Sequence, residues 1–212
     1  MKSASPEPRR VRNPRGQGGL LREEIILACT RLLDRSGSEL TLSLRAIARE
    51  AHVAAPSVSR HFHDLAEIID AVIAQQVQAF HAHLCEAHAL VSQPRDRLRA
   101  LARAYVDFGI QMPSRYRVLF NRVALPLWND PDRSMEETSP MMMRTFDMIA
   151  GAVQECIDGG IALQGDAKLS AVLLWYSCHG LVTLRQSITS FPWPDLDEAI
   201  DEILQRTVGF TE

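Results

Sequence analysis

The chain has 212 residues, of which 46% are apolar, and its formal net charge is −3. This length and apolar content suffice for one or two folded domains with ample core. No apolar run reaches the ~18 residues of a membrane-spanning helix. No long apolar stretch follows the basic N-terminus, as a secretory signal would require. We therefore expect a cytoplasmic protein without a membrane partner.

Residues 1–19 are predicted to be a disordered basic arm, because they are rich in proline and glycine. Residues 1–64 hold 11 Lys and Arg against 7 Asp and Glu, a balance of +4, whereas residues 65–212 hold 12 against 19, a balance of −7. A basic arm before an acidic body indicates a polyanion partner. A solvated tail without a partner is the alternative, and both are compatible because such arms can become ordered in the DNA minor groove.

Residues 20–66 have the pattern of three helices. The first is expected from about Leu20 to Ser36, where Gly37 ends it. In the second, apolar residues recur at the spacing of one helical face: Leu44, Ile47, Ala48 and Ala51. Pro56 can open a third, short helix, on which Val58 and Phe62 share a face.

Two short helices joined by a turn over a shared apolar core form a helix-turn-helix, which places its second helix in the DNA major groove. Arg45 and Arg49 would project from the outer side of the first of these helices, and Ser57, Arg60 and His61 from the second. Cations and short hydroxyls contact phosphates and base edges. An ordinary helical bundle would share this pattern, so it remains the alternative.

The segment TLSLRAIAREAHVAAPSVSRHFHDLAEI, residues 41–68, resembles the DNA-binding domain of TetR-family transcriptional regulators. The chain has His52 where the family usually has Gly, Ser59 where it has Tyr, and Leu65 where it has Lys; the Tyr and Lys commonly contact phosphate in the family. The resemblance and the residue chemistry predict these DNA-binding residues: Arg10, Arg12 and Arg15 of the arm, with Thr41, Ser43, Arg45, Ala55, Pro56, Ser57, Ser59, Arg60 and His61.

Residues 67–212 are predicted to form an effector-binding and dimerisation domain. Asp64 can cap a long helix that reaches about His88. Further helices are expected at about 94–112, 114–121, 140–158, 166–190 and 195–208, with a loop at 126–139. The result is an all-α protein of about nine helices, an order that also resembles the TetR family. Trp175 and the run His179-Gly180-Leu181 resemble a C-terminal subgroup with a Trp-His-Gly signature, although here the Trp stands four residues before the His.

Bulky, soft side chains are concentrated in this second part of the chain. Methionines and aromatic rings line adaptable apolar sites, but they are also ordinary core residues of helical bundles. The family resemblance implies an effector pocket, for which we predict Phe108, Met112, Tyr116, Phe120, Trp128, Met142, Phe146, Trp175 and His179. His179 would share a helical face with Trp175, and it could equally be a hydrogen-bonded core histidine.

Four cysteines lie in helical patterns without paired spacing: Cys29, Cys85, Cys156 and Cys178. This pattern favours small buried residues over disulfides, with a free redox-sensing thiol as the alternative. His81, Cys85 and His88 fall on one helical face, but no fourth ligand is evident, so we predict no metal site and no cofactor.

Two helices near the C-terminus carry small and apolar residues at helical spacing, which would allow close helix approach. These stripes could pack within one subunit, but the resemblance implies a homodimer whose interface uses Leu173, Ser177, Gly180, Leu184, Ile200, Ile203 and Leu204. A two-fold dimer would bind a palindromic double-stranded DNA operator.

No glycine-rich phosphate loop, nucleophile elbow or paired metal carboxylates appear in the sequence, so an enzyme is not expected. We predict a DNA-binding transcriptional regulator, a repressor released from its operator by a small apolar or aromatic effector. The alternatives are a helical protein-binding adaptor without DNA specificity and a transcriptional activator of the same fold.

Overall fold

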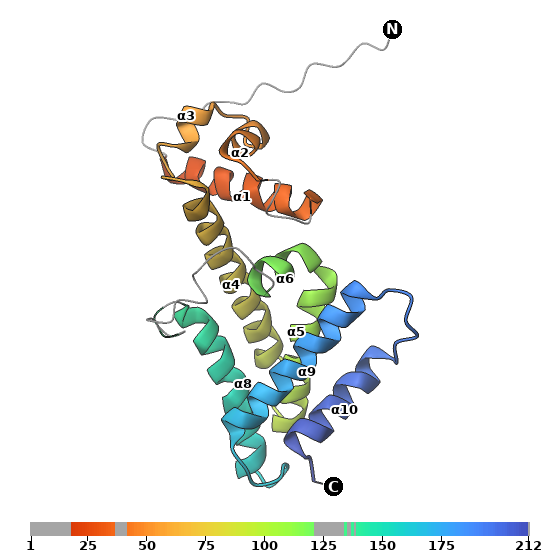
Figure 1. Ribbon diagram of the computed structural model, residues 1–212. Coiled ribbons are helices and arrows are strands. Elements are labelled where there is room, and N and C mark those ends of the chain that lie inside the picture. The colour runs from red at the N-terminus through yellow and green to blue at the C-terminus, as the bar shows by residue number, and fades with distance from the viewer. Residues whose placement is uncertain (1–17, 37–41, 121–133, 135–136, 138, 212) are drawn as a thin grey trace. The chain divides into compact units, whose positions relative to one another are not determined.

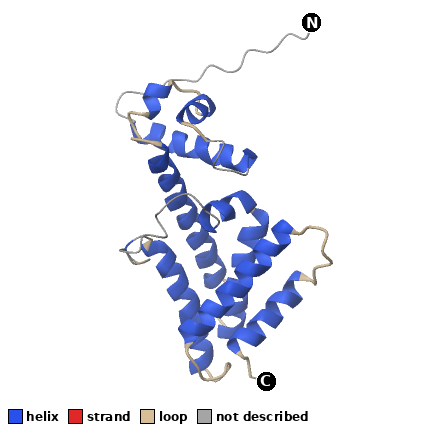
Figure 2. Cartoon of the chain, in the orientation of Figure 1, coloured by secondary structure: helices blue, strands red, loops and turns tan. Residues whose placement is uncertain are grey.

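The computed structural model describes residues 18–36, 42–120, 134, 137 and 139–211. Within them lie nine helices, drawn in Figures 1 and 2: α1 (Gly18–Ser36), α2 (Leu44–Glu50), α3 (Ala55–Val58), α4 (Leu65–Ala89), α5 (Pro94–Gln111), α6 (Pro113–Phe120), α8 (Pro140–Asp158), α9 (Ala167–Ser187) and α10 (Leu196–Val208). The described part has no strand beyond a single β-bridge between Ala162 and Phe210. The expected all-helical class is confirmed.

The chain divides into two compact units, one on each side of the bond between Ala74 and Gln75. Helix α4 runs through this division, so its first turns belong to the first unit and the rest to the second. In the first unit α2 packs against both α1 and α3. Its core contains the apolar residues that sequence spacing placed inward, among them Ile25, Ile47, Val58 and Phe62.

Helix starts follow from local capping. Asp64 accepts a hydrogen bond from the backbone N–H of Glu67 at 2.9 Å, and the Glu67 carboxylate accepts one from the N–H of His63, one residue before the cap, so the arrangement is a variant of the capping box. Asp166 and Asp195 accept backbone N–H bonds at the starts of α9 and α10. Such caps satisfy N–H groups that have no partner within a helix.

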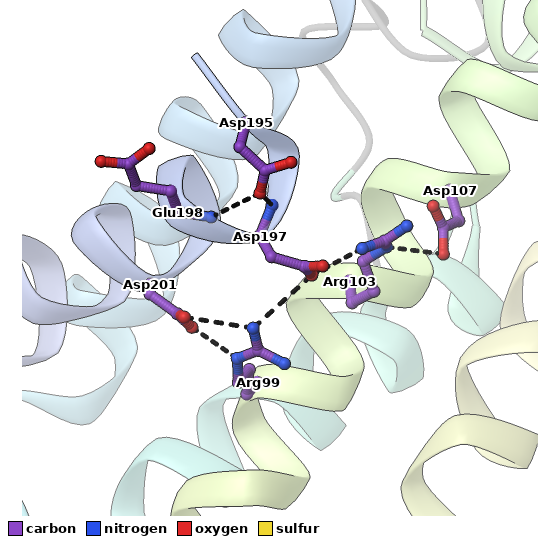
Figure 3. A network of polar contacts seen from close by, with 7 residues as sticks. All are labelled: Arg99, Arg103, Asp107, Asp195, Asp197, Glu198 and Asp201. Atoms are coloured by element: carbon purple, nitrogen blue, oxygen red, sulfur yellow. Dashed lines mark hydrogen bonds and ion pairs between the residues drawn. The ribbon is translucent and has the colours of Figure 1, made fainter.

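In the second unit α9 packs against α5, α8 and α10 (Figure 1). Helix α5 approaches α9 closely at Gly109, where an added Cβ would lie 2.4 Å from a Val182 methyl carbon. Charged residues join α5 to α10 at the surface (Figure 3): Arg99 pairs with Asp201, and Arg103 pairs with both Asp107 and Asp197. These contacts direct one face of α10 toward α5.

Candidate functional site

The helix-turn-helix segment has a left-handed turn. Ser43 caps α2 by accepting a hydrogen bond from the Ala46 N–H at 3.1 Å. His52, in the turn after α2, has φ +54°, the backbone region that glycine adopts most readily. Helix α3 follows with Pro56 in its first turn. The departure from Gly at position 52 therefore falls where the chain needs a left-handed residue.

The outer surface of this segment carries cations and hydroxyls. Ser43, Arg45, Pro56, Ser59 and Arg60 are exposed, whereas Ala55, Ser57 and His61 are half-buried. Arg60 donates a hydrogen bond from Nη2 to Ser57 Oγ at 2.9 Å, so one exposed cation is held beside a hydroxyl of α3. Arg10, Arg12, Arg15 and Thr41, also predicted to contact DNA, lie outside the described residues.

The arginines of the first unit have two different roles. Arg31 and Arg35 of α1 both pair with Glu50 of α2, and these hydrogen bonds lower the pKa of Glu50 to about 2. Within the described residues, Arg45 and Arg49 form no ion pair. A guanidinium without an internal carboxylate can pair with a phosphate. The first pair of arginines therefore holds the helices together, and the second pair is available to an anionic partner.

The second unit contains a partly open apolar cavity of about 240 Å³. Residues from five helices line it: Phe80 of α4, Tyr105 of α5, Phe120 of α6, Met142, Met143, Thr145, Phe146 and Ile149 of α8, and Trp175 of α9. The Phe80 ring packs edge-on against Tyr105, with centroids 5.4 Å apart, and against Phe120 at 5.9 Å. Helices α4, α5, α6 and α9 thus each contribute an aromatic ring to the wall, and α8 contributes two methionines together with Thr145, Phe146 and Ile149.

A short chain of polar groups borders the cavity. Trp175 donates its indole N–H to the Tyr105 hydroxyl at 3.0 Å, that hydroxyl lies 3.0 Å from the Tyr116 hydroxyl, and Tyr116 lies 2.7 Å from His179 Nδ1. Each group is satisfied if both hydroxyls donate toward His179. Burial lowers the pKa of His179 and raises those of both tyrosines, so all four groups are uncharged near neutral pH.

The cavity contains only part of the predicted effector set. Phe120, Met142, Phe146 and Trp175 line it, whereas Phe108 and Tyr116 are buried outside its wall, and Met112 and His179 are half-buried and do not line it. Trp128 lies outside the described residues. The predicted effector set lacks five of the lining residues: Phe80, Tyr105, Met143, Thr145 and Ile149. No spacing rule distinguishes these from core residues, because they come together only through contacts between helices.

Helix α9 has an exposed apolar face. Leu169, Leu173, Tyr176 and Leu184 are 57%, 43%, 67% and 47% exposed, and they recur at the spacing of one helical face with Gly180, at which an added Cβ would meet nothing within 4 Å. The predicted interface residues of α10 differ: Ile200 and Leu204 are each 1% exposed and Ile203 is half-buried. Ile200 and Leu204 pack within the chain, so they have no surface left for a second subunit.

No helix of the described residues has both the length and the apolar character needed to cross a membrane.

Comparison with known proteins gives a family match over residues 98–209, just over half of the 212 residues, to the tetracyclin repressor-like C-terminal domain. No curated protein matches the sequence.

Solved structures match nearly the whole chain. A protein of unknown function from Rhodococcus sp. RHA1 is 26% identical, covers 88% of this chain and 93% of its own, and has a TM-score of 0.75. A TetR family transcription regulator from Marinobacter aquaeolei VT8 is 16% identical, with coverages of 92% and 98% and a TM-score of 0.68. A transcriptional regulator FadR from Bacillus subtilis, solved in complex with stearoyl-CoA, is 15% identical, with coverages of 88% and 97% and a TM-score of 0.65.

Proposed function

The chain belongs to the TetR family of transcriptional regulators, and from that premise we propose that it is a homodimeric repressor that leaves its operator when a small apolar or aromatic effector fills the cavity of the second unit. The observation that carries this proposal is the cavity itself, which lies among five helices and is almost entirely apolar. Polar groups near it come from neutral side chains, so the site favours an uncharged ligand.

The solved structures support an apolar effector. One of the matched regulators holds stearoyl-CoA, and another is named a putative fatty acid metabolism regulator from Clostridium perfringens. Ligand pockets commonly measure roughly 300–1,000 Å³, and the cavity here is about 240 Å³. The effector is therefore a compact apolar molecule, or an apolar group of a larger one. The Trp-His-Gly subgroup resemblance is in keeping with this pocket, because Trp175 lines it and His179 borders it through Tyr116.

DNA binding is assigned to the exposed surface of α2 and α3. Arg45 and Arg60 are its central cations, and Ser43, Ser57, Ser59 and His61 add short polar groups. If Arg45 or Arg60 contacts a guanine edge, substitution by Ala costs about 1–3 kcal/mol of binding free energy and relaxes the choice of one base pair. A contact to phosphate alone would weaken binding to all sequences alike. The basic arm adds contacts that make affinity more sensitive to salt.

The dimer is assigned to the exposed face of α9, with Leu173, Gly180 and Leu184 from the predicted set and Leu169 and Tyr176 from the structure. Burying this face removes apolar surface from water. Gly180→Arg would place a long cation in a close helix contact, where an unpaired charge is costly. Light scattering that shows this variant still dimeric would place the interface elsewhere.

Release from DNA follows from linkage. An effector can bind more tightly to the conformation that has lower operator affinity. It then weakens DNA binding by at most the ratio of its own affinities for the two conformations, and DNA weakens effector binding by the same factor. Helix α4 is the covalent connection between the units, and its Phe80 lines the cavity. Ligand contact with this helix is thus the proposed origin of the coupling.

The test combines operator binding with ligand binding. Gel shifts with DNA that flanks the protein's own gene should show salt-sensitive, sequence-selective binding that Arg60→Ala weakens and Arg206→Ala, a change of an exposed arginine on α10, leaves intact. A helical adaptor would show no such shift.

An effector at ~100 times its Kd should raise the free energy of unfolding by ~2.7 kcal/mol and release the DNA. Phe146→Ala should weaken ligand binding and should leave operator binding unchanged when no ligand is present. Loss of operator binding in Phe146→Ala would show that the residue is structural.

A further inference from the structure

Helices α4 and α8 bring three metal-binding side chains together beside the cavity. Cys85 Sγ lies 3.4 Å from His81 Nε2 and 3.9 Å from Met148 Sδ. All three residues are half-buried, and Cys85 is in this respect unlike the other three cysteines, which are buried as expected. Among the described residues no three His, Cys, Asp or Glu side chains gather as a metal site. The third donor here is a thioether, which sequence spacing along α4 could not indicate.

The hydrogen bond that His81 makes through Nδ1 determines which tautomer the neutral ring adopts. Thr145 donates its hydroxyl hydrogen to the Met141 carbonyl at 2.9 Å, so its oxygen is left to accept a hydrogen bond from His81 Nδ1, 2.8 Å away. Neutral His81 therefore carries its proton on Nδ1 and has a lone pair on Nε2 facing the Cys85 sulfur. A ring oriented by a hydrogen bond through its other nitrogen is the usual arrangement of a metal-ligating histidine.

The distances fit a bound metal. A metal bonded at ~2.0 Å to a histidine nitrogen and at ~2.3 Å to sulfur, the values for zinc, holds nitrogen and sulfur about 3.5–3.8 Å apart and two sulfurs about 3.8–4.0 Å apart at tetrahedral to trigonal angles. At the 120° angles of a three-coordinate site, these bond lengths place nitrogen and sulfur about 3.7 Å apart and the two sulfurs about 4.0 Å apart. The observed 3.4 Å is shorter by about 0.3 Å and the observed 3.9 Å by about 0.1 Å, so small shifts of the side chains would admit the metal.

We propose that His81, Cys85 and Met148 form a three-coordinate site for monovalent copper. Thiolate and thioether sulfurs are soft donors that select Cu(I). Charge points the same way: Cu(I) with one thiolate is neutral, whereas a divalent ion would leave a net positive charge beside an apolar cavity, which is costly. Binding displaces the thiol proton of Cys85 to solvent, and no other bond changes.

The site is joined to the cavity through one residue. Thr145 lines the cavity and also holds His81 in its metal-ligating orientation. Metal binding at this site can be measured on the protein alone, without DNA, so it can be tested separately from the proposed DNA recognition. A failed operator assay therefore leaves this inference standing, and failed copper binding leaves the regulator proposal standing.

The experiment is an anaerobic titration of the full chain with Cu(I) in competition with a chromogenic Cu(I) chelator. We expect one Cu(I) per chain, and X-ray absorption that reports one nitrogen and two sulfur ligands. Cys85→Ser should abolish binding that competes with the chelator while the other three cysteines remain. Thr145→Val should weaken binding about 10–100-fold, because it removes the hydrogen bond that orients His81.

Matched variants separate this site from incidental metal binding. Met148→Leu should weaken Cu(I) binding and Met143→Leu, the same change on the same helix, should not; His81→Asn should weaken it and His88→Asn should not. Circular dichroism and melting temperature check that each variant is folded. Equal binding within either pair, unchanged binding in Cys85→Ser, or tighter binding of Zn(II) than of Cu(I) would overturn the proposal.

Discussion

The two units of the chain differ in the length of their helices and in what their cores contain. The first unit has two very short helices, α2 with 7 residues and α3 with 4, which pack over a buried apolar core and are joined to α1 by the pairing of Glu50 with Arg31 and Arg35. The second unit has long helices around an aromatic cluster and retains a cavity. A unit that presents a fixed surface needs local rigidity, whereas a unit that accepts a ligand must leave space unfilled.

Truncating a central aromatic ring should have the largest effect. Phe80 is 1% exposed and its ring contacts Tyr105, Phe108 and Phe120, so Phe80→Ala should lower the free energy of unfolding by about 3–5 kcal/mol. Denaturant unfolding measures the loss, and hydrogen exchange locates it. Faster exchange in α5 and α8 with unchanged exchange in α2 would support separate stabilisation of the units; equal loss of protection in both would contradict it.

The close approach of α5 and α9 can be tested with a single methyl group. Gly109→Ala adds a Cβ 2.4 Å from a Val182 methyl, and overpacking of this kind costs about 1–3 kcal/mol. Gly151→Ala is the matched control in α8, where nothing lies within 4 Å of the added atom. That change should stabilise the helix by about 0.5–1 kcal/mol. Thermal melting of the two variants should therefore shift in opposite directions.

The strained turn of the first unit should respond to a glycine. His52 has φ +54°, and left-handed backbone costs roughly 1–2 kcal/mol for most L-residues. Glycine removes this strain but increases the freedom of the unfolded chain by an amount worth about 0.4–1 kcal/mol. His52→Gly should thus stabilise the first unit by up to about 1.6 kcal/mol. Slower hydrogen exchange in α2 and α3 would show it, whereas faster exchange would mean that the imidazole makes a stabilising contact.

The stability of the two units should depend on pH in different ranges, and these effects should be smaller than those of the substitutions above. Burial lowers the pKa of His179 below 6.5 in the folded state, so the unfolded state binds more protons between the two values. Stability in the second unit therefore falls as pH drops below about 6.5. His179→Gln should make this dependence shallower in urea unfolding at a series of pH values; an identical slope would exclude His179 as its source.

Glu50 also loses its contribution to stability as pH falls, but it does so at lower pH than His179. Its pKa is about 2 in the folded state against an ordinary 4.5, so its contribution is fully present above 4.5 and disappears as pH falls through 2. Glu50→Gln should remove this part of the acid sensitivity of the first unit and leave behaviour near pH 6 unchanged. Hydrogen exchange of α1 and α2 at pH 3 and pH 5 would test it, and equal protection in both proteins would contradict the assignment.

Features set within a few residues were predictable. Asp64 caps the helix that follows it, as the sequence indicated, and Asp166 and Asp195 cap helices whose starts were expected at these residues, because a side-chain oxygen needs only the backbone two or three residues ahead. The helix-turn-helix core was predictable for the same reason, since Ile47, Val58 and Phe62 are inward by helical spacing alone. The left-handed turn was visible as an unusual His at the Gly position, although its backbone angle was not.

What the sequence determined by itself was therefore the helical class, the order and approximate ends of the helices, and the DNA-binding motif. Only the tertiary structure decided which apolar residues enclose space. Phe80 and Tyr105 look like core residues in sequence, yet they line the cavity, and Ile200 and Leu204 look like an interface, yet they are buried within the chain. The physical reason is the range of the interactions. Caps and helical faces depend on neighbours along the chain. A cavity wall or a buried face depends on contacts between residues far apart in sequence, as the pairing of Arg99 with Asp201 joins α5 to α10.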